Sequence, residues 1–126
     1  NMKELKNNLD ALNSIDPDDH TATINGLSID LQGFQGSAVV FSVGTVTDGV
    51  HTPKVEESDD NSNWNDVSSV DQEGTLSDLV SGTNQRVGYK GAKRYLRAVL
   101  TVSGVTIGAQ VAGIVLRGMP HREPVN

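Results

Sequence analysis

Residues 95–102 constrain the fold more than any other part of this sequence. They read YLRAVLTV, which places Leu96, Ala98, Leu100 and Val102 on one side of an extended chain. Tyr95, Arg97, Val99 and Thr101 lie on the other side, and this period of two is typical of a β-strand with one face packed on a core. Because glycine-rich residues and a second apolar run follow, we expect an all-β protein.

Further strands are predicted along the chain between turn signals. Residues 21–31 form a hairpin around the Asn25-Gly26 pair, which favours a two-residue turn. Strands are also expected over residues 37–46, 52–57, 86–89 and 105–117, the last of them apolar on both faces. Such a strand is central and covered on both sides, and its Gly108 and Gly113 indicate a bulge or a close approach of other backbone. The spacing predicts an antiparallel β-sandwich of jelly-roll-like type.

The two ends of the chain are expected to differ from this body. Met2, Leu5, Leu9 and Leu12 recur at helical spacing and predict a short amphipathic helix over residues 2–13, ended by Pro17. The final residues, 118–126, contain two prolines and predict an extended tail. We therefore expect an N-terminal arm (1–15), a sandwich (16–117) and a tail (118–126).

Composition narrows the class of protein. There is no cysteine, so disulfides and thiolate metal sites are excluded, and no apolar run has the length of a membrane helix. The first residues lack the apolar region of a signal peptide, so we expect no secretion by that route. Catalytic signatures are also missing, and His20, His51 and His121 lie far apart in sequence. We expect a protein that is not an enzyme and carries neither metal nor cofactor.

Charge is divided unevenly along the sequence. Residues 1–85 hold three lysines against fifteen acidic residues, a net charge of −12, whereas residues 86–126 hold seven basic residues against one glutamate, a net charge of +6. Acidic and basic strands lying side by side in one fold would neutralise this separation, and a bipolar surface facing a partner is the alternative. The basic turn consists of Arg86, Lys90, Lys93, Arg94 and Arg97. The acidic balance of the whole chain argues against nucleic acid as its partner.

Two loop features suggest ligands and have plainer explanations. The acidic residues Glu57, Asp59, Asp60 and Asp66 could hold calcium, although the spacing fails as an EF-hand; a loop capped by its own side chains is the alternative. Trp64, with Tyr89 and Tyr95, could stack on a sugar, whereas a lone tryptophan more often closes the core.

Four segments carry a resemblance to a known group. DDHTATINGLSIDLQGF, VGTVTDGVHTPKVEESDDNSNWNDV, VGYKGAKRYLRAVLTVSG and LRGMPHREPV, spread over residues 16–125, make the chain similar to small virion proteins of tailed bacteriophages. These proteins are encoded among the head and tail structural genes of long-tailed phages and related prophages. The resemblance implies a structural protein of the particle, made in the bacterial cytoplasm and located in the virion.

Within that group we expect a capsid decoration protein on the outside of the head, since an acidic surface suits the outside better than the DNA-facing inside. Its partners would be the major capsid protein, other virion proteins and further copies of itself, with no membrane involved. Alternatives are a head–tail joint or tail protein, and a carbohydrate-binding module using Trp64, Tyr89 and Tyr95. The expected contacts are the helix stripe, the basic turn and the tail residues Met119, Pro120, Arg122 and Pro124.

Overall fold

The structure is a computed structural model that describes the backbone of residues 4–120 and the side chains of residues 4–118. In chain order its elements are η1 (Lys6–Asn8), β1 (Leu9–His20), β2 (Ile24–Asn25), β3 (Ile29–Asp30), β4 (Phe34–Val46), β5 (Val50–Ser58), β6 (Asn65–Asp66), η2 (Ser69–Asp71), β7 (Gln72–Glu73), β8 (Asn84–Tyr89), β9 (Tyr95–Ser103) and β10 (Ala109–Pro120). No helix among residues 4–120 is long and apolar enough to span a membrane.

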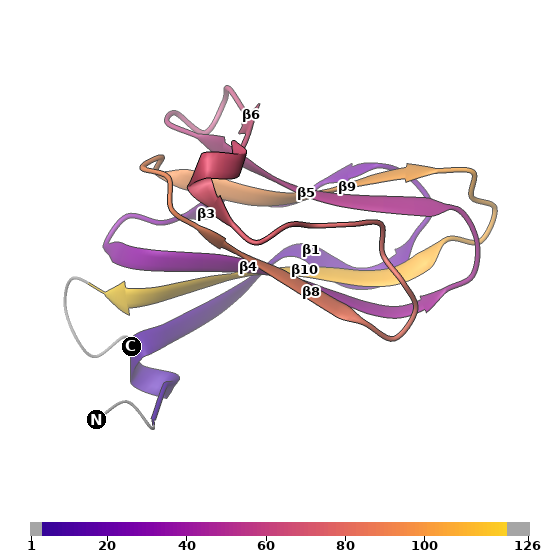
Figure 1. The fold of residues 1–126 in the computed structure, drawn as a ribbon, viewed down its shortest axis with the longest axis horizontal. Helices are drawn as coiled ribbons and strands as arrows, with labels where there is room; N and C mark the ends of the chain where they lie inside the picture. Colours follow the sequence, from indigo (N-terminus) through magenta and orange to yellow (C-terminus); the bar gives the residue numbers. More distant parts are fainter. Residues whose placement is uncertain (1–3, 121–126) are drawn as a thin grey trace.

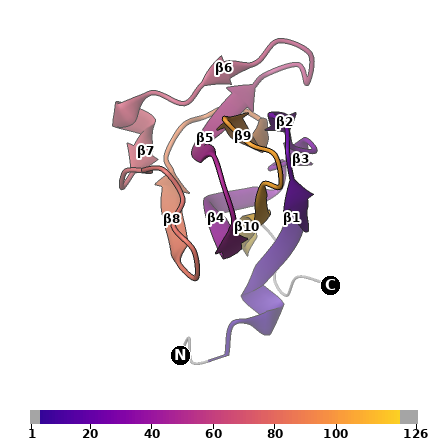
Figure 2. The same ribbon diagram turned by 90° about the vertical axis from the view of Figure 1, so that its right-hand side faces the viewer.

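The strands form two antiparallel sheets packed face to face (Figures 1 and 2). Sheet A has the order β1-β10-β4-β8-β7, and sheet B has the order β2-β9-β5-β6 with β3 also paired to β9. Because β2 and β3 pair with successive parts of β9, they are two halves of one interrupted strand. The orders β1-β10-β4-β8 and β2/β3-β9-β5-β6 are those of a jelly roll. The predicted fold class is confirmed.

The core lies between the sheets and is built from aliphatic side chains with one central aromatic ring. Leu96, Ala98 and Leu100 of β9 are fully buried, as the alternation predicts, and they belong to one core cluster with Phe41 and Val39 of β4. β10 lies between β1 and β4, so the expectation of a central strand is confirmed.

The helix predicted over residues 2–13 is wrong for the described residues. Residues 6–8 form one 3-10 turn, and the chain then enters β1, which crosses the boundary expected at residue 15. A helix of this length is marginal by itself, whereas pairing with β10 supplies a long hydrogen-bonded ladder and a place for Leu12 and Ile15. Pro17 fits within β1 because it lies at a bulge of an edge strand.

The hairpin predicted over residues 21–31 is also wrong. Gly26 does not turn the chain; its N–H donates to the carbonyl of Ala98 at 2.7 Å, so the segment continues along β9. A Cβ at position 26 would lie 2.3 Å from Ser14 Oγ and 2.6 Å from the Ala98 oxygen. The glycine is required by close packing and not by a tight turn.

A buried hydroxyl joins the two sheets at this point. Ser14 is the extra residue of a bulge in β1, between the pairs Asn13–Ile114 and Ile15–Gly113, and its side chain is 2% exposed. Ser14 Oγ accepts a bond from Ala98 N at 2.9 Å and donates to Leu27 O at 2.8 Å. The bulge therefore aims one polar group at the gap where sheet B is interrupted.

Candidate functional site

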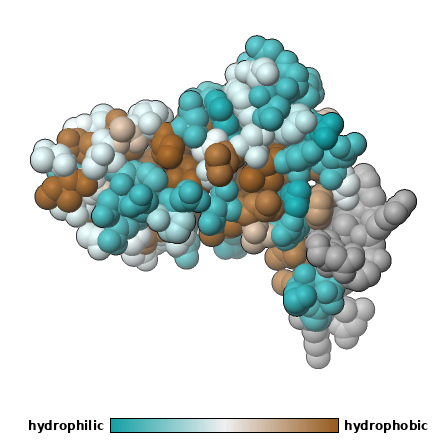
Figure 3. Space-filling view, turned by 180° about the vertical axis from the view of Figure 1, so that it is seen from behind, coloured by the Kyte–Doolittle hydropathy of each residue, from teal (hydrophilic) through white to brown (hydrophobic). Residues whose placement is uncertain are grey.

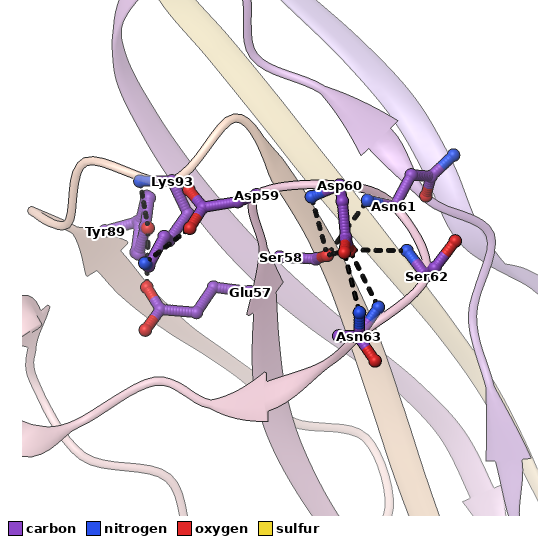
Figure 4. A network of polar contacts seen from close by, with 9 residues as sticks. All are labelled: Glu57, Ser58, Asp59, Asp60, Asn61, Ser62, Asn63, Tyr89 and Lys93. Atoms are coloured by element: carbon purple, nitrogen blue, oxygen red, sulfur yellow. Dashed lines mark hydrogen bonds and ion pairs between the residues drawn. The ribbon is translucent and has the colours of Figure 1, made fainter.

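The acidic loop after β5 is ordered by its own side chains (Figure 4). The carboxylate of Asp60 accepts bonds from the backbone N–H groups of Ser62 at 2.9 Å and Asn63 at 2.8 Å, and from the side chains of Asn63 and Ser58. These bonds, led by the two backbone donors, hold the pKa of Asp60 well below its usual range. The loop is thus capped internally, as the plainer of the two explanations predicts.

The neighbouring acidic residues are each engaged by a different group. Tyr89 donates its hydroxyl proton to Glu57 at 2.6 Å, and Lys93 Nζ lies 2.8 Å from Asp59 (Figure 4). Asp66 pairs with Lys54 at 2.9 Å. Among residues 4–120 no group of three or more His, Cys, Asp or Glu side chains converges on a point that could hold a metal ion, so the calcium alternative finds no site in this region.

Tyr89 connects this loop to the turn between β8 and β9. Its hydroxyl accepts a bond from Lys93 N at 3.0 Å while donating to Glu57. Burial, followed by the contact with Glu57, raises the pKa of Tyr89 above its ordinary value, so the phenol is a neutral donor at any physiological pH. The Tyr89 hydroxyl therefore connects the end of β5, at Glu57, to the β8–β9 turn, at Lys93.

Trp64 packs against Arg97 on the outer surface of sheet B. The guanidinium carbon of Arg97 lies 4.2 Å from the Trp64 ring centroid, and the same guanidinium donates to Glu56 at 2.6 and 2.8 Å. The Arg97 and Glu56 side chains are 18% and 12% exposed, so this pair is more shielded than an ordinary surface ion pair. One face of the indole is covered by an arginine of the same chain.

Apart from Arg86, the remaining members of the basic turn also have ion-pair partners within the described part of the chain. Arg94 forms a two-pronged pair with Asp30 at 2.8 and 3.0 Å, which lowers the pKa of that carboxyl, and its guanidinium lies over the Tyr95 ring. Lys90 approaches Glu73 at 3.4 Å. The intramolecular explanation of the uneven charge is therefore the one that the structure shows for these residues. A role for the basic turn in contacting a partner stays a prediction.

The other predicted contact residues lie in different places, and some of them are outside the described part of the chain. Leu5 and Leu9 are exposed, whereas Leu12 packs against the core. Met119 and Pro120 end β10 beside β4, and their side chains are outside the described part. Met2, Arg122, Pro124 and His121 lie outside the described residues.

His20 and His51 are buried and hydrogen-bonded to backbone. His20 Nε2 lies 3.0 Å from the carbonyl oxygens of both Asp16 and Val111, so this nitrogen donates. His51 Nε2 lies 2.9 Å from the carbonyl oxygen of Asp48. Each ring thus hydrogen-bonds the end of its strand to the backbone, so both histidines have a structural role.

A carboxylate clamp holds the far end of the sandwich. Asp48, in the β4–β5 turn, accepts backbone N–H bonds from Thr106 at 3.0 Å, Ile107 at 3.2 Å and Gly108 at 2.7 Å. These bonds lower the pKa of Asp48.

Seen from behind, the molecule has hydrophobic surface at this end of the sandwich and along the seam between the two sheets (Figure 3). Val50 and Ile107, which lie at this end, are about half exposed or more.

The outer face of sheet A is a feature that the sequence analysis did not assign. Val40 and Ile114 are paired across β4 and β10 on the side away from the core, as are Ala38 and Leu116. The signal was present in the sequence as the run of residues 105–117, which is apolar on both faces. It was interpreted as a strand covered on both sides, but no described element within residues 4–120 packs over the middle of this face (Figures 1 and 2).

No family model and no curated protein matches this chain. Among solved structures, it is similar to a chain in a structure of infectious bursal disease virus, Gx strain, with a TM-score of 0.43 and 13% sequence identity. The match covers 90% of this chain and 32% of that chain, so the present sequence spans about a third of the viral chain's length.

Proposed function

We propose that this chain is a non-enzymatic structural protein of a bacteriophage virion, which binds the outer surface of the head as a decoration protein. The observation that carries the proposal is an N-terminal arm, residues 4–9, that exposes two leucines at one end of the jelly roll. Leu5 is 54% exposed and Leu9 is 37% exposed. Both leucines precede the part of β1 that packs on the core, so the packing of the sandwich does not require hydrophobic residues at these two positions.

The position of the arm supports binding to a repeated surface. Leu9 is in register with Gly118, so the arm lies beside the end of β10, and both extend from the same end of the sandwich. Leu9 also borders a largely apolar hollow of about 470 Å³. Covering exposed leucine side chains with a partner removes apolar surface from water and so favours binding. Many such weak contacts on a lattice would add up through avidity.

Two further considerations favour this reading. The sequence resemblance to phage virion proteins extends over the residues that form both sheets. The net charge of −6 suits the outside of a head better than its DNA-filled interior. The carbohydrate alternative gains no support, because Arg97 covers one face of Trp64, Arg94 lies over Tyr95, and the Tyr89 hydroxyl is committed to Glu57. The three rings do not offer one free stacking surface.

The test is to add the purified chain to phage or prophage particles that lack it and to separate bound from free protein by sedimentation. Decoration predicts co-sedimentation with heads and many copies per head, located by electron microscopy on the outer surface. A few copies at one vertex would indicate a joint protein, and binding along tails would indicate a tail protein. Failure to bind any part of the particle would refute a virion role.

A pair of variants then examines the arm. Leu5→Ser combined with Leu9→Ser should reduce the bound fraction at least tenfold, because two apolar contacts are lost at every site. Leu27→Ser is the matched control, since Leu27 is 64% exposed but belongs to the β2–β3 linker. Equal binding by both variants would remove the arm from the interface.

A further inference from the structure

The outer face of sheet A is apolar where a sandwich exposed to water would be polar. The central strands β4 and β10 carry Ala38, Val40, Ile114 and Leu116 on this face, although their other sides already form the core. Antiparallel sheets with one solvated side normally alternate apolar and polar residues. Two central strands that are apolar on both sides indicate a sheet with material packed on both sides.

Many of the neighbours on this face are small, which leaves room for a second sheet to approach. Asn13 is paired with Ile114 and Arg86 with Val40, and the small neighbours are Ala11, Gly36, Gly88, Ala112 and Gly118. Two shallow hollows lie along this face, one of about 470 Å³ lined by Leu9, Ala38 and Leu116, and one of about 400 Å³ lined by Ser42 and Ala112. Sheets pack about 10 Å apart when small and branched side chains meet in this way.

Charge at the two margins of the face is complementary. On the β8 margin Arg86 is in register with Val40. Of the eight described lysines and arginines, Lys6 and Arg86 are the two that form no ion pair with a residue in the described part. On the β1 margin Asp18 and Asp19 border the second hollow, and neither forms an ion pair with a described residue.

We propose that this face packs against the same face of a second copy of the chain, related by a two-fold axis that runs along the strands. Such an axis places the β8 margin of one copy over the β1 margin of the other, so that Arg86 meets Asp18 and Asp19 twice in one isologous interface. An axis across the strands would instead place acidic β1 over acidic β1. Charge therefore selects the first arrangement.

The offset along the strands is compatible with this pairing. Arg86 lies at the same height along the sheet as Ile114, and Asp18 lies at the height of Val111. Val111 and Ile114 are three residues apart in β10, which corresponds to about 10 Å along the strand. Aligned sheets cross at about 30°, which moves the margins of the two copies past one another. The arginine side chain covers the rest of the distance.

The area available indicates a weak dimer. Four strands spaced about 4.8 Å apart and about nine residues long present roughly 600 Å² per copy, or about 1,200 Å² in total. That is the lower limit for a specific interface, so the dimer should form at micromolar to submillimolar concentrations and dissociate on dilution. A contact of this strength suits a chain that is also bound to the head through other residues.

The test is sedimentation equilibrium of the isolated full chain from about 1 µM to about 1 mM, which does not depend on capsid binding. We expect a monomer–dimer equilibrium that Ile114→Lys shifts at least tenfold towards monomer. Ile107→Lys is the matched control, since Ile107 is 61% exposed but lies in the β9–β10 turn, and it should leave the equilibrium unchanged.

Charge reversal tests the orientation with residues that cannot disturb the core. Arg86→Glu alone should weaken the dimer, and adding Asp18→Lys and Asp19→Lys should restore it. Circular dichroism confirms that each variant is folded. A wild-type chain that stays monomeric at 1 mM overturns the proposal, as does a dimer indifferent to Ile114→Lys. A monomeric chain whose Ile114→Lys variant loses head binding would assign the face to a capsid partner instead and overturn self-association.

Discussion

Replacing Ser14 by alanine should cost stability out of proportion to the single oxygen removed. Ser14 Oγ is the acceptor for Ala98 N at 2.9 Å, and Ala98 is fully buried. The carbonyl of Ala98 is bonded to Gly26 N on the same edge of β9, so the interrupted strand offers no replacement acceptor for the N–H. An unpaired buried N–H costs about 1–3 kcal/mol, and the lost bond to Leu27 O adds little because Leu27 is exposed.

We therefore expect Ser14→Ala to lower the free energy of unfolding by about 2 kcal/mol. For a chain of 126 residues, 1 kcal/mol corresponds to about 4 °C in Tm, so the melting temperature should fall by roughly 8 °C. The measurement is urea denaturation followed by circular dichroism, with a thermal scan alongside. An unchanged dependence on urea concentration would show that the same fold is being compared.

Thr23→Val provides the matched control, because Thr23 also accepts a bond from a backbone N–H of β9. Thr23 Oγ1 accepts a bond from Val102 N at 3.0 Å, so it makes the same kind of contact with β9, but in an exposed position. Water can replace that hydroxyl, and the loss should be below about 0.5 kcal/mol. If the two variants lost equal stability, the reasoning that burial of the Ala98 N–H makes Ser14 important would be refuted.

Three further variants address separate features. Gly108→Ala should cost at least about 2 kcal/mol, since its φ is +96° and a Cβ would lie 2.2 Å from the carbonyl oxygen of His20. Asp48→Asn should lower the urea midpoint at pH 7. The folded-state pKa of Asp48 is below the unfolded value of about 3.9, so the carboxylate stabilises the fold fully above that value. The gap between wild type and variant should therefore narrow as the pH falls below about 3.9. Arg97→Ala should cost about 1–3 kcal/mol and shift the fluorescence of Trp64, the sole tryptophan, to longer wavelength.

Controls for these variants are available in the chain. Gly33→Ala has a similar φ of +92° but no atom within 4 Å of the new Cβ, so the difference from Gly108→Ala isolates the clash. Lys90→Ala removes an exposed pair and should cost less than about 1 kcal/mol, with no change in tryptophan emission. An Asp48→Asn gap that does not narrow as the pH falls below about 3.9 would contradict the clamp as the source of the pH dependence.

The sequence by itself determined the sandwich because its strands carry local signals. The alternation of residues 95–102 reappears as the buried row of Leu96, Ala98 and Leu100, since a period of two leaves one face of a strand for the core. Gly108 was correctly read as a point of close backbone approach. These features depend on side-chain order along one segment, so they could be read without knowing what lies opposite.

Only the tertiary structure decided what happens at the N-terminus and around Asn25-Gly26. Leu9 and Leu12, which are spaced for a helix, lie in β1 because pairing with β10 supplies a long hydrogen-bonded ladder, which a short helix cannot match. Gly26 follows β9 because it packs closely between Ala98 of β9 and Ser14 of the other sheet. The partners of the basic turn likewise come from distant strands, Glu56 for Arg97 and Asp30 for Arg94. Contacts between residues far apart in the chain decide these points, and no local pattern encodes them.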